Sequence, residues 1–489
     1  MLRRLVPVWL LALGTTTALA DTPTGLTDAS GARYGTKREV IRVPGPPDTT
    51  EHALVSPIIY LNRCVGGCTL TRGTDDDATQ NKAHPLLISA EATFSPFVHS
   101  DQVWNDVVKC VKEIYSPYDV QITETRPATG TQYHMAVVAG TSGEAGRPDA
   151  LGVAIVNNGN CAPRNNGISL TFANSHTPGS SLVNDLCWTI GQESAHSFGL
   201  DHSFKWLDGR STCNDPLTYQ SDCGGQRFYR NDTATCGEFS KRECACGSTQ
   251  NSHAKLLATF GPSMQAPLIP PPTAMVTTPA NNAALGAIVA AQAGSKRGVA
   301  KVELFINGFK WAEAKGAQFG QNGQPNPASY TLMVPASVPS SKMDITVKAY
   351  DDLGAVTESA VVQSYKGNPA GCADASTCAK GQKCEAGKCF WDPPSGELGA
   401  DCTYNEFCKS MTCNGPEGAT ICTQSCLPGS ADSCPENLEC LATSATSGIC
   451  YTKDEGGGCC SVGEGGSSAL VHGGISALLL GLLLRRRRK

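Results

Sequence analysis

The placement of the cysteines constrains the fold of this chain more than any other feature of its sequence. The chain has 489 residues and 24 cysteines, and 14 of these lie between positions 372 and 460. Because few large apolar side chains accompany them, disulfides rather than a hydrophobic core must hold that region together. Ten further cysteines lie between Cys64 and Cys246, an even number that can pair completely. So many cysteines indicate an oxidising compartment.

The cysteine-rich disulfide region is assigned to residues 372–450. It contains a group of four cysteines that ends at Cys389 and eight more from Cys402 to Cys450. Zinc binding is the alternative for this region, but C-x-x-C pairs are lacking. The sequence leaves the disulfide connectivity open.

Residues 1–20 have the form of a secretory signal peptide. Two arginines at positions 3 and 4 precede an apolar run over 5–13, and a small-residue pattern, Ala-Leu-Ala, ends at position 20. A short membrane anchor is the alternative. We therefore expect the chain to be secreted through the Sec pathway and to begin near Asp21.

The C-terminus has three parts in a fixed order. Residues 451–466 are a glycine-rich tether with the pair Cys459-Cys460, residues 467–484 are mostly apolar, and residues 485–489 are basic. A helix over 467–484 spans about 27 Å, close to the ~30 Å bilayer core, so a membrane segment with a cytoplasmic basic end is predicted. The tail resembles the MYXO-CTERM sorting signals of myxobacterial surface proteins. The resemblance implies processing near the cysteines and display at the cell envelope or outer surface of a bacterium; a plain membrane anchor is the alternative.

The charge balance excludes one class of partner. There are 39 basic and 44 acidic residues, for a net charge of −5. Without a basic surface, nucleic acid is not expected to bind. Hydrophobic residues make up 40% of the chain, enough for a sizeable core.

Between the two ends, the chain divides into two larger parts and a linker. Residues 21–262 mix helical and strand patterns, and residues 263–272 form a stiff, proline-rich linker. In residues 273–366 apolar side chains alternate with others, and Asn307-Gly308 is typical of a hairpin turn. This part resembles the bacterial Ig-like modules found beside secreted catalytic domains, which implies an all-β Ig-like sandwich acting as a spacer or adhesion module.

The residues that carry chemistry lie on one predicted helix and just beyond it. Leucines at 182 and 186 and an isoleucine at 190 recur at a helical spacing. Gln192 and His196 are four residues apart and share one face of that helix, with Glu193 beside them. Gly199 can end the helix and turn the chain, which would bring His202 back toward the same point.

This run reads Q-E-x-x-H-x-x-G-x-x-H and resembles the H-E-x-x-H-x-x-G-x-x-H zinc motif of the metzincin metalloproteases. The resemblance implies an α+β peptidase domain over 21–262 that binds one Zn²⁺. It implies that His196 and His202 are metal ligands, that Gln192 replaces the first histidine ligand, that Glu193 is the general base, and that Gly199 permits the turn. An unrelated helix matching by chance is the structural alternative.

The glutamine leaves three outcomes open, because an amide oxygen is a poorer zinc ligand than an imidazole. Gln192 ligates zinc weakly, or another side chain completes the site, or the site is empty and the domain is an inactive relative. The candidates for the second outcome are His176, His253 and Asp201.

Metzincins also have a methionine turn beneath the metal, and residues 214–219 are the candidate here. Leu217 would take the place of the methionine, and Tyr219 matches a Met-x-Tyr spacing in which the hydroxyl approaches the metal or the oxyanion. A plain surface turn is the alternative. The metzincin layout also has an edge strand that binds substrate backbone, and Ile168–Phe172 could fill that role.

The sequence therefore predicts a multidomain fold: an α+β domain, an Ig-like sandwich, a small disulfide-rich region and a C-terminal membrane segment. We expect a secreted, surface-displayed, zinc-dependent metalloendopeptidase that hydrolyses extracellular polypeptides. The alternative is a catalytically inactive surface protein of the same fold that acts in binding or adhesion to a surface ligand.

Overall fold

The computed structural model describes residues 26–27, 33–34, 38–44, 55–221, 223–316, 326–416, 418–430, 433–435 and 437–452. The predicted signal peptide, the predicted membrane segment 467–484 and the Cys459-Cys460 pair lie outside these residues. No helix within the described ranges is both long enough and apolar enough to cross a membrane. The chain divides into two compact units: residues 1–379 with 383–390, and residues 380–382 with 391–489.

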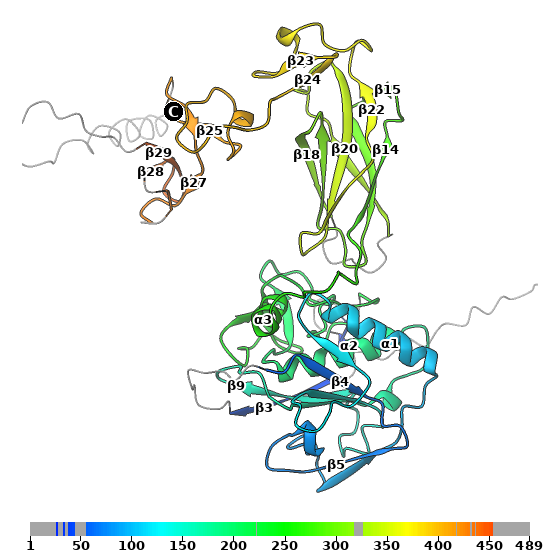
Figure 1. Ribbon diagram of the computed structural model, residues 1–489. Helices are drawn as coiled ribbons and strands as arrows, with labels where there is room; N and C mark the ends of the chain where they lie inside the picture. Colours follow the sequence, from blue (N-terminus) through cyan, green and yellow to red (C-terminus); the bar gives the residue numbers. More distant parts are fainter. Residues whose placement is uncertain are drawn as a thin grey trace, which may run out of the picture. The chain divides into compact units, whose positions relative to one another are not determined.

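A six-stranded mixed sheet organises the first part of the first unit (Figure 1). All of its strand pairs are parallel except that between β9 and β10. In spatial order the strands are β3 (Arg38–Pro44), β9 (Gly152–Asn158), β10 (Ile168–Thr171), β8 (His134–Val138), β4 (Ile58–Asn62) and β7 (Gln121–Thr123).

Both faces of this sheet are covered, so side chains alternate between two cores rather than between core and water. Along β8, Ala136 and Val138 belong to the core shared with helices α1 (Asp101–Tyr115) and α2 (Leu182–Ser197). Met135 and Val137 face the other core, beneath a hairpin of β5 (Cys68–Thr71) and β6 (Glu91–Phe94). Figure 1 shows α1 and α2 on one side of the sheet and β5 on the other.

Helix α2 lies deep in the fold, and this placement sets the position of the motif residues. The predicted amphipathic pattern understates its burial, because every residue from Leu186 to Ser197 is buried. Gly191 permits the close approach of α1: a Cβ there would lie 2.7 Å from Cδ1 of Ile114. A disulfide between Cys110 and Cys187 joins the two helices.

The structure corrects the expected substrate-binding edge strand. Strand β10 begins at Ile168, as predicted, but it lies inside the sheet, with β9 on one side and β8 on the other. It pairs with β8 along its whole length and with β9 at Leu170 and Thr171, so it has no free edge for another strand. Strand β9 lies one position nearer the edge, and β3 covers it.

Short elements and disulfides hold the region after α2. The elements are β11 (Ser203–Trp206), β12 (Ala234–Cys236), β13 (Thr249–Gln250) and α3 (Ser252–Phe260). All ten cysteines between Cys64 and Cys246 are paired, as expected. The pairs are Cys64–Cys68, Cys110–Cys187, Cys161–Cys246, Cys213–Cys223 and Cys236–Cys244. Nearer the N-terminus, β1 (Leu26–Thr27) pairs with β2 (Arg33–Tyr34).

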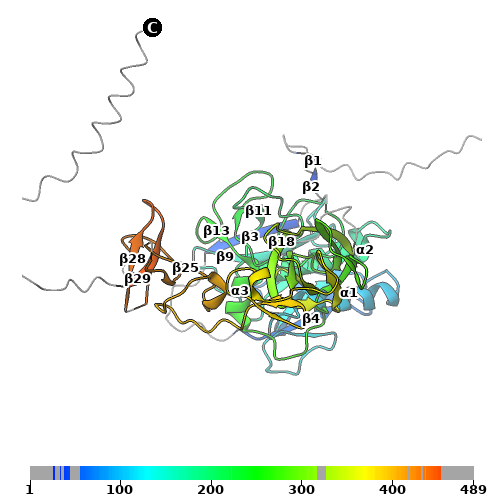
Figure 2. The same ribbon diagram turned by 90° about the horizontal axis from the view of Figure 1, so that it is seen from above.

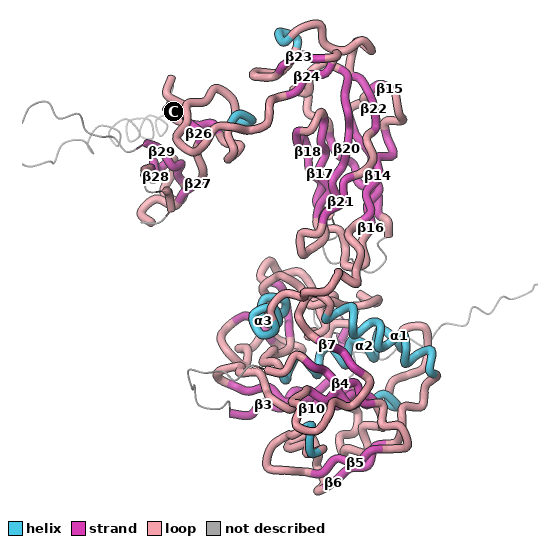
Figure 3. Tube along the Cα trace, viewed as in Figure 1, coloured by secondary structure: helices cyan, strands magenta, loops and turns pink. Residues whose placement is uncertain are grey.

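The predicted β-sandwich is confirmed (Figure 3). One sheet consists of β14 (Thr273–Thr278), β16 (Ile288–Gly294) and β19 (Ala328–Met333). The other has the order β15 (Ala283–Ala284), β22 (Val362–Tyr365), β20 (Lys342–Tyr350), β17 (Lys301–Ile306) and β18 (Phe309–Lys315), with β21 (Val356–Glu358) beside β20. Asn307 and Gly308 form the predicted turn between β17 and β18, both at positive φ.

The disulfide-rich region is also confirmed, and its first four cysteines belong to the first unit. A hairpin of β23 (Lys383–Glu385) and β24 (Lys388–Phe390) extends the sandwich sheet through β20. The second unit contains β25 (Cys413–Asn414), β26 (Ile421–Cys422), β27 (Ser425–Cys426), β28 (Leu438–Ala442) and β29 (Gly448–Thr452). The pairs are Cys372–Cys384, Cys378–Cys389, Cys402–Cys413, Cys408–Cys422, Cys426–Cys440 and Cys434–Cys450, so these cysteines are not zinc thiolates.

Candidate metal centre

Helix α2 ends in a Schellman turn at Gly199. The amide of Leu200 donates to the carbonyl of Ala195, and the amide of Gly199 donates to that of His196. Gly199 has a φ of 88°, and a Cβ at this position would lie 2.1 Å from the carbonyl oxygen of Cys161. Both the conformation and the close approach therefore require glycine.

The turn brings the two motif histidines together, as predicted. The Nε2 atoms of His196 and His202 lie 3.0 Å apart, and the two rings are nearly perpendicular. Both side chains are buried. The six-residue separation of these histidines in sequence thus becomes a direct contact in space.

The other nitrogen of each ring faces an acceptor. Nδ1 of His196 lies 2.7 Å from the carbonyl oxygen of Leu200, and Nδ1 of His202 lies 2.8 Å from Oε1 of Glu238. Burial lowers the pKa of His196 to about 3 and also lowers the pKa of His202, so both rings are neutral near pH 7. A neutral ring that donates from Nδ1 has a lone pair on Nε2. The 3.0 Å contact is a hydrogen bond when one ring is protonated on Nε2; when both rings are protonated on Nδ1 alone, two lone pairs face each other, an arrangement that a cation between them stabilises.

Two further motif side chains present oxygens without partners. Oε1 of Gln192 and both carboxyl oxygens of Glu193 are buried and have no hydrogen-bond partner among the described residues. The side chain of Glu193 lies over Gly152 of β9, where a Cβ would come within 2.6 Å of Oε1. Burial raises the pKa of Glu193 well above its usual value, and the charge of Arg38 opposes this shift. A nearby cation would favour its ionised form.

The predicted turn at residues 214–219 lies against the same histidines. Leu217 is fully buried in the core that α1 and α2 share. The carbonyl of Thr218 lies 3.5 Å from Nε2 of Gln192, and the ring of Tyr219 packs edge-on against His202 with centroids 4.6 Å apart. The turn therefore lies beside the motif residues and is not a surface turn.

A cluster of charges lies on the far side of His202. Asp201 accepts hydrogen bonds from Arg42 at 2.8 Å and from both terminal nitrogens of Arg242 at 2.6 and 2.7 Å, and Arg242 also pairs with Glu238. Burial alone would raise the pKa values of Asp201 and Glu238, but hydrogen bonds from Arg242 and, for Glu238, from His202 hold both well below their usual range. Although Asp201, His202 and Glu238 converge closely enough to hold an ion, the two guanidinium groups already neutralise both carboxylates.

The remaining histidine candidates make other contacts. Nδ1 of His253 lies 3.0 Å from the hydroxyl of Tyr118, and Nε2 of His176 lies 3.5 Å from Oγ1 of Thr189. Among the candidate third ligands, Gln192 is the one with a buried oxygen that lacks a partner.

Strand β3 and its arginines lie over the motif, and no pattern in the sequence predicts this position. The hydroxyl of Tyr219 donates to the carbonyl of Arg38 and accepts from its amide at 3.0 Å. Figure 1 and Figure 2 both show β3 beside β9, and the pairing aligns Arg38 with Gly152. No local sequence signal identifies these contacts, because the side chain of Arg38 donates to Thr189, which is 151 positions later in the chain.

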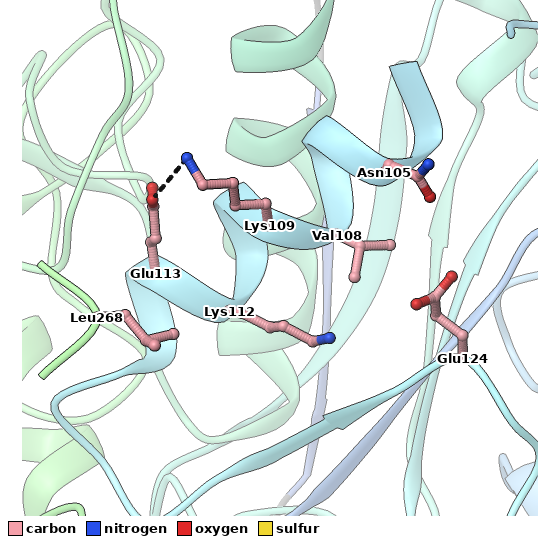
Figure 4. A pocket seen from close by; sticks show the side chains of 7 residues that line it. All are labelled: Asn105, Val108, Lys109, Lys112, Glu113, Glu124 and Leu268. Atoms are coloured by element: carbon pink, nitrogen blue, oxygen red, sulfur yellow. Dashed lines mark ion pairs between the residues drawn. The ribbon is translucent and has the colours of Figure 1, made fainter. Parts of the chain in front are cut away.

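A separate pocket lies on α1, away from the motif helix. It contains none of the motif residues, and Lys109 pairs with Glu113 in its lining (Figure 4). It is lined by Asn105, Val108, Lys109, Lys112, Glu113, Glu124 and Leu268. We assign no function to it.

Comparisons with known proteins do not identify the chain. No protein family model matches it, and no curated protein matches it. The fibronectin(III)-like modules of CbhA from Clostridium thermocellum are similar to a part of it, with 18% identity over 19% of this chain and 94% of that chain, at a TM-score of 0.15. So low a score supports no inference, and the sandwich is assigned from its own strand pairing.

Proposed function

We propose that the domain over residues 21–262 is a metzincin-like, zinc-dependent endopeptidase that acts on extracellular polypeptides. The observation that carries this proposal is the 3.0 Å approach of Nε2 of His196 to Nε2 of His202, with both Nδ1 atoms facing acceptors. Two imidazole nitrogens that each bind one zinc at 2.0–2.1 Å lie within about 4.2 Å of each other. The observed separation falls inside that limit.

His196, His202 and Gln192 would hold the ion. The unpartnered Oε1 of Gln192 supports its role as the third ligand, although an amide is a weaker donor than imidazole. Zinc with three protein ligands lowers the pKa of a bound water to about 7 and polarises a carbonyl.

The chain's own residues supply the rest of the chemistry. Glu193 would accept a proton from the attacking water and pass it to the leaving amine, because both of its carboxyl oxygens are buried and have no partner among the described residues. The ring of Tyr219 contacts His202. Its hydroxyl would donate a hydrogen bond to the oxyanion once its hydrogen bonds to the backbone of Arg38 on β3 are broken. The outer edge of β9 would bind the substrate backbone by strand addition.

The surroundings of the domain support an extracellular role. Eleven disulfides lie within the described residues, which is typical of secreted proteins. We propose that the protein is displayed at the envelope or outer surface of a bacterium, with the sandwich and the disulfide-rich region as spacer or adhesion modules. The second candidate function, a binding protein without catalysis, is favoured by the neutral Gln192 in the ligand set.

The test is cleavage of a fluorescein-labelled unfolded casein by the zinc-loaded full chain. The assay uses the variant with Arg38→Ala and Arg42→Ala, since these two side chains anchor β3 over the motif. We expect cleavage, and a loss of at least about 100-fold when Glu193→Gln is added, with zinc retained. A zinc-loaded chain that cleaves no faster than the Glu193→Gln chain would reject the peptidase and leave the binding protein.

A further inference from the structure

Strand β3 is an unusual edge strand because its most buried side chain is charged. Arg38 is 2% exposed, whereas the apolar side chains of β3 that contact the cores (Val40, Ile41 and Val43) are only partly buried. An edge strand that mainly stabilises a fold buries apolar side chains. Here the strand inserts an arginine beside the candidate metal centre instead.

The Arg38 side chain lies in a seat formed by Trp188 and Thr189, whose chemistry recognises a guanidinium group. Nε of Arg38 donates to Oγ1 of Thr189 at 2.9 Å, and the guanidinium carbon lies 3.5 Å from the centre of the Trp188 ring. Tryptophan is the best aromatic partner for a cation. Burial lowers the pKa of Arg38 to about 10, and the nearby carboxyl groups of Asp185 and Glu193 oppose this shift.

Backbone pairing and a second arginine hold the same segment. The seven residues from Arg38 to Pro44 pair in register with those from Gly152 to Asn158. Arg42 lies 2.8 Å from Asp201, next to the motif. The segment thus combines strand addition, which is indifferent to sequence, with a side-chain seat, which is not.

We propose that the outer edge of β9 and the Trp188–Thr189 seat form a groove for an extended polypeptide with an arginine side chain, and that residues 38–44 are its present occupant. The claim that this groove selects substrates rests on the proposed peptidase function. The claim that it binds such a polypeptide does not. The native substrate would place an arginine where Arg38 now lies, and β3 must leave before it binds.

The test is the binding of two fluorescein-labelled peptides to the full chain with Arg38→Ala and Arg42→Ala, measured by fluorescence anisotropy in EDTA. One peptide has the sequence of residues 37–45, and its twin has alanine at position 38. We expect the arginine peptide to bind at least about tenfold more tightly than the alanine twin, and at least about tenfold more tightly than it binds the wild-type chain. Equal affinities for the two peptides would overturn the proposal.

Two controls keep the result interpretable. Arg63→Ala removes an arginine that contacts Asp101 and Trp104 instead, and this chain should bind neither peptide better than wild type does. Should the double variant unfold, amide exchange on the wild-type chain replaces it. Millimolar arginine peptide should then speed exchange in residues 38–44 and the alanine twin should not; no difference between the peptides would overturn the proposal.

The outcomes separate this inference from the peptidase proposal. Arginine-selective binding by a chain that takes up no zinc would retain the groove and reject the peptidase. Zinc binding and cleavage without selectivity between the peptides would retain the peptidase and reject the groove.

Discussion

The Nδ1 atom of His202 lies 2.8 Å from a carboxyl oxygen of Glu238, a residue 36 positions later in the chain. This contact fixes the proton of the ring on Nδ1 and leaves Nε2 to face His196. His196 reaches the same state through the carbonyl of Leu200, which the Schellman turn presents to it. Two different partners thus prepare both rings to donate lone pairs to one point.

Glu238→Gln is expected to weaken zinc binding about 10- to 100-fold, because a carboxylate partner makes a ligating imidazole more basic and holds its orientation. Titration against a chelating dye measures this affinity. The exposed Glu243 lies in the same loop and provides the control, since Glu243→Gln should leave the affinity unchanged. Equal affinities for wild type and Glu238→Gln would mean that Glu238 does not orient His202.

Gly199→Ala is expected to destabilise the fold far more than Gly209→Ala. Both glycines have positive φ, 88° and 85°, but a Cβ at Gly209 meets no atom within 4 Å, whereas one at Gly199 meets the backbone of Cys161. The left-handed conformation alone costs alanine about 1–2 kcal/mol. The clash should add about 1–3 kcal/mol, and chemical denaturation of both variants measures the difference. Similar losses would show that the turn yields to the added methyl group.

The stability of the fold should fall as the pH drops below about 6.5, in part because of His134. Burial lowers the pKa of this histidine to about 3, so the unfolded chain binds its proton more readily than the folded chain does. The free energy of unfolding should then lose about 1.4 kcal/mol per pH unit from His134 between its unfolded value of about 6.5 and its folded value. Denaturation at pH 6.5 and 4.5 should show a smaller loss in His134→Gln by about 2–3 kcal/mol. Parallel slopes for the two chains would contradict the buried, neutral state.

Much of the candidate site follows from local sequence. The motif from Gln192 to His202 predicted both the helix and the turn, because helical spacing and a glycine act over a few residues. The turn that holds Leu217 and Tyr219 was also placed correctly next to the histidines. The hairpin turn between β17 and β18 at Asn307 is another feature that short-range sequence signals predict.

The missing features depend on contacts between distant segments. The sequence of β3 does not specify that it pairs with β9, because that pairing joins segments far apart in the chain, and the seat of Arg38 comes from Trp188 on a different element. For the same reason β10 was mistaken for an edge strand: its composition suits a buried strand, but strand order is not encoded locally. The partner of His202, Glu238, lies in an irregular loop that no periodicity marks.

The most direct test of the account is the zinc content of the full chain, purified oxidised and without chelator. We predict about one zinc per chain in the wild type, its loss in His196→Ala, and its retention in His253→Ala, whose imidazole contacts Tyr118 instead. An absence of zinc at micromolar supply, or full zinc content in His196→Ala, would contradict the assignment of His196 and His202 as a metal centre.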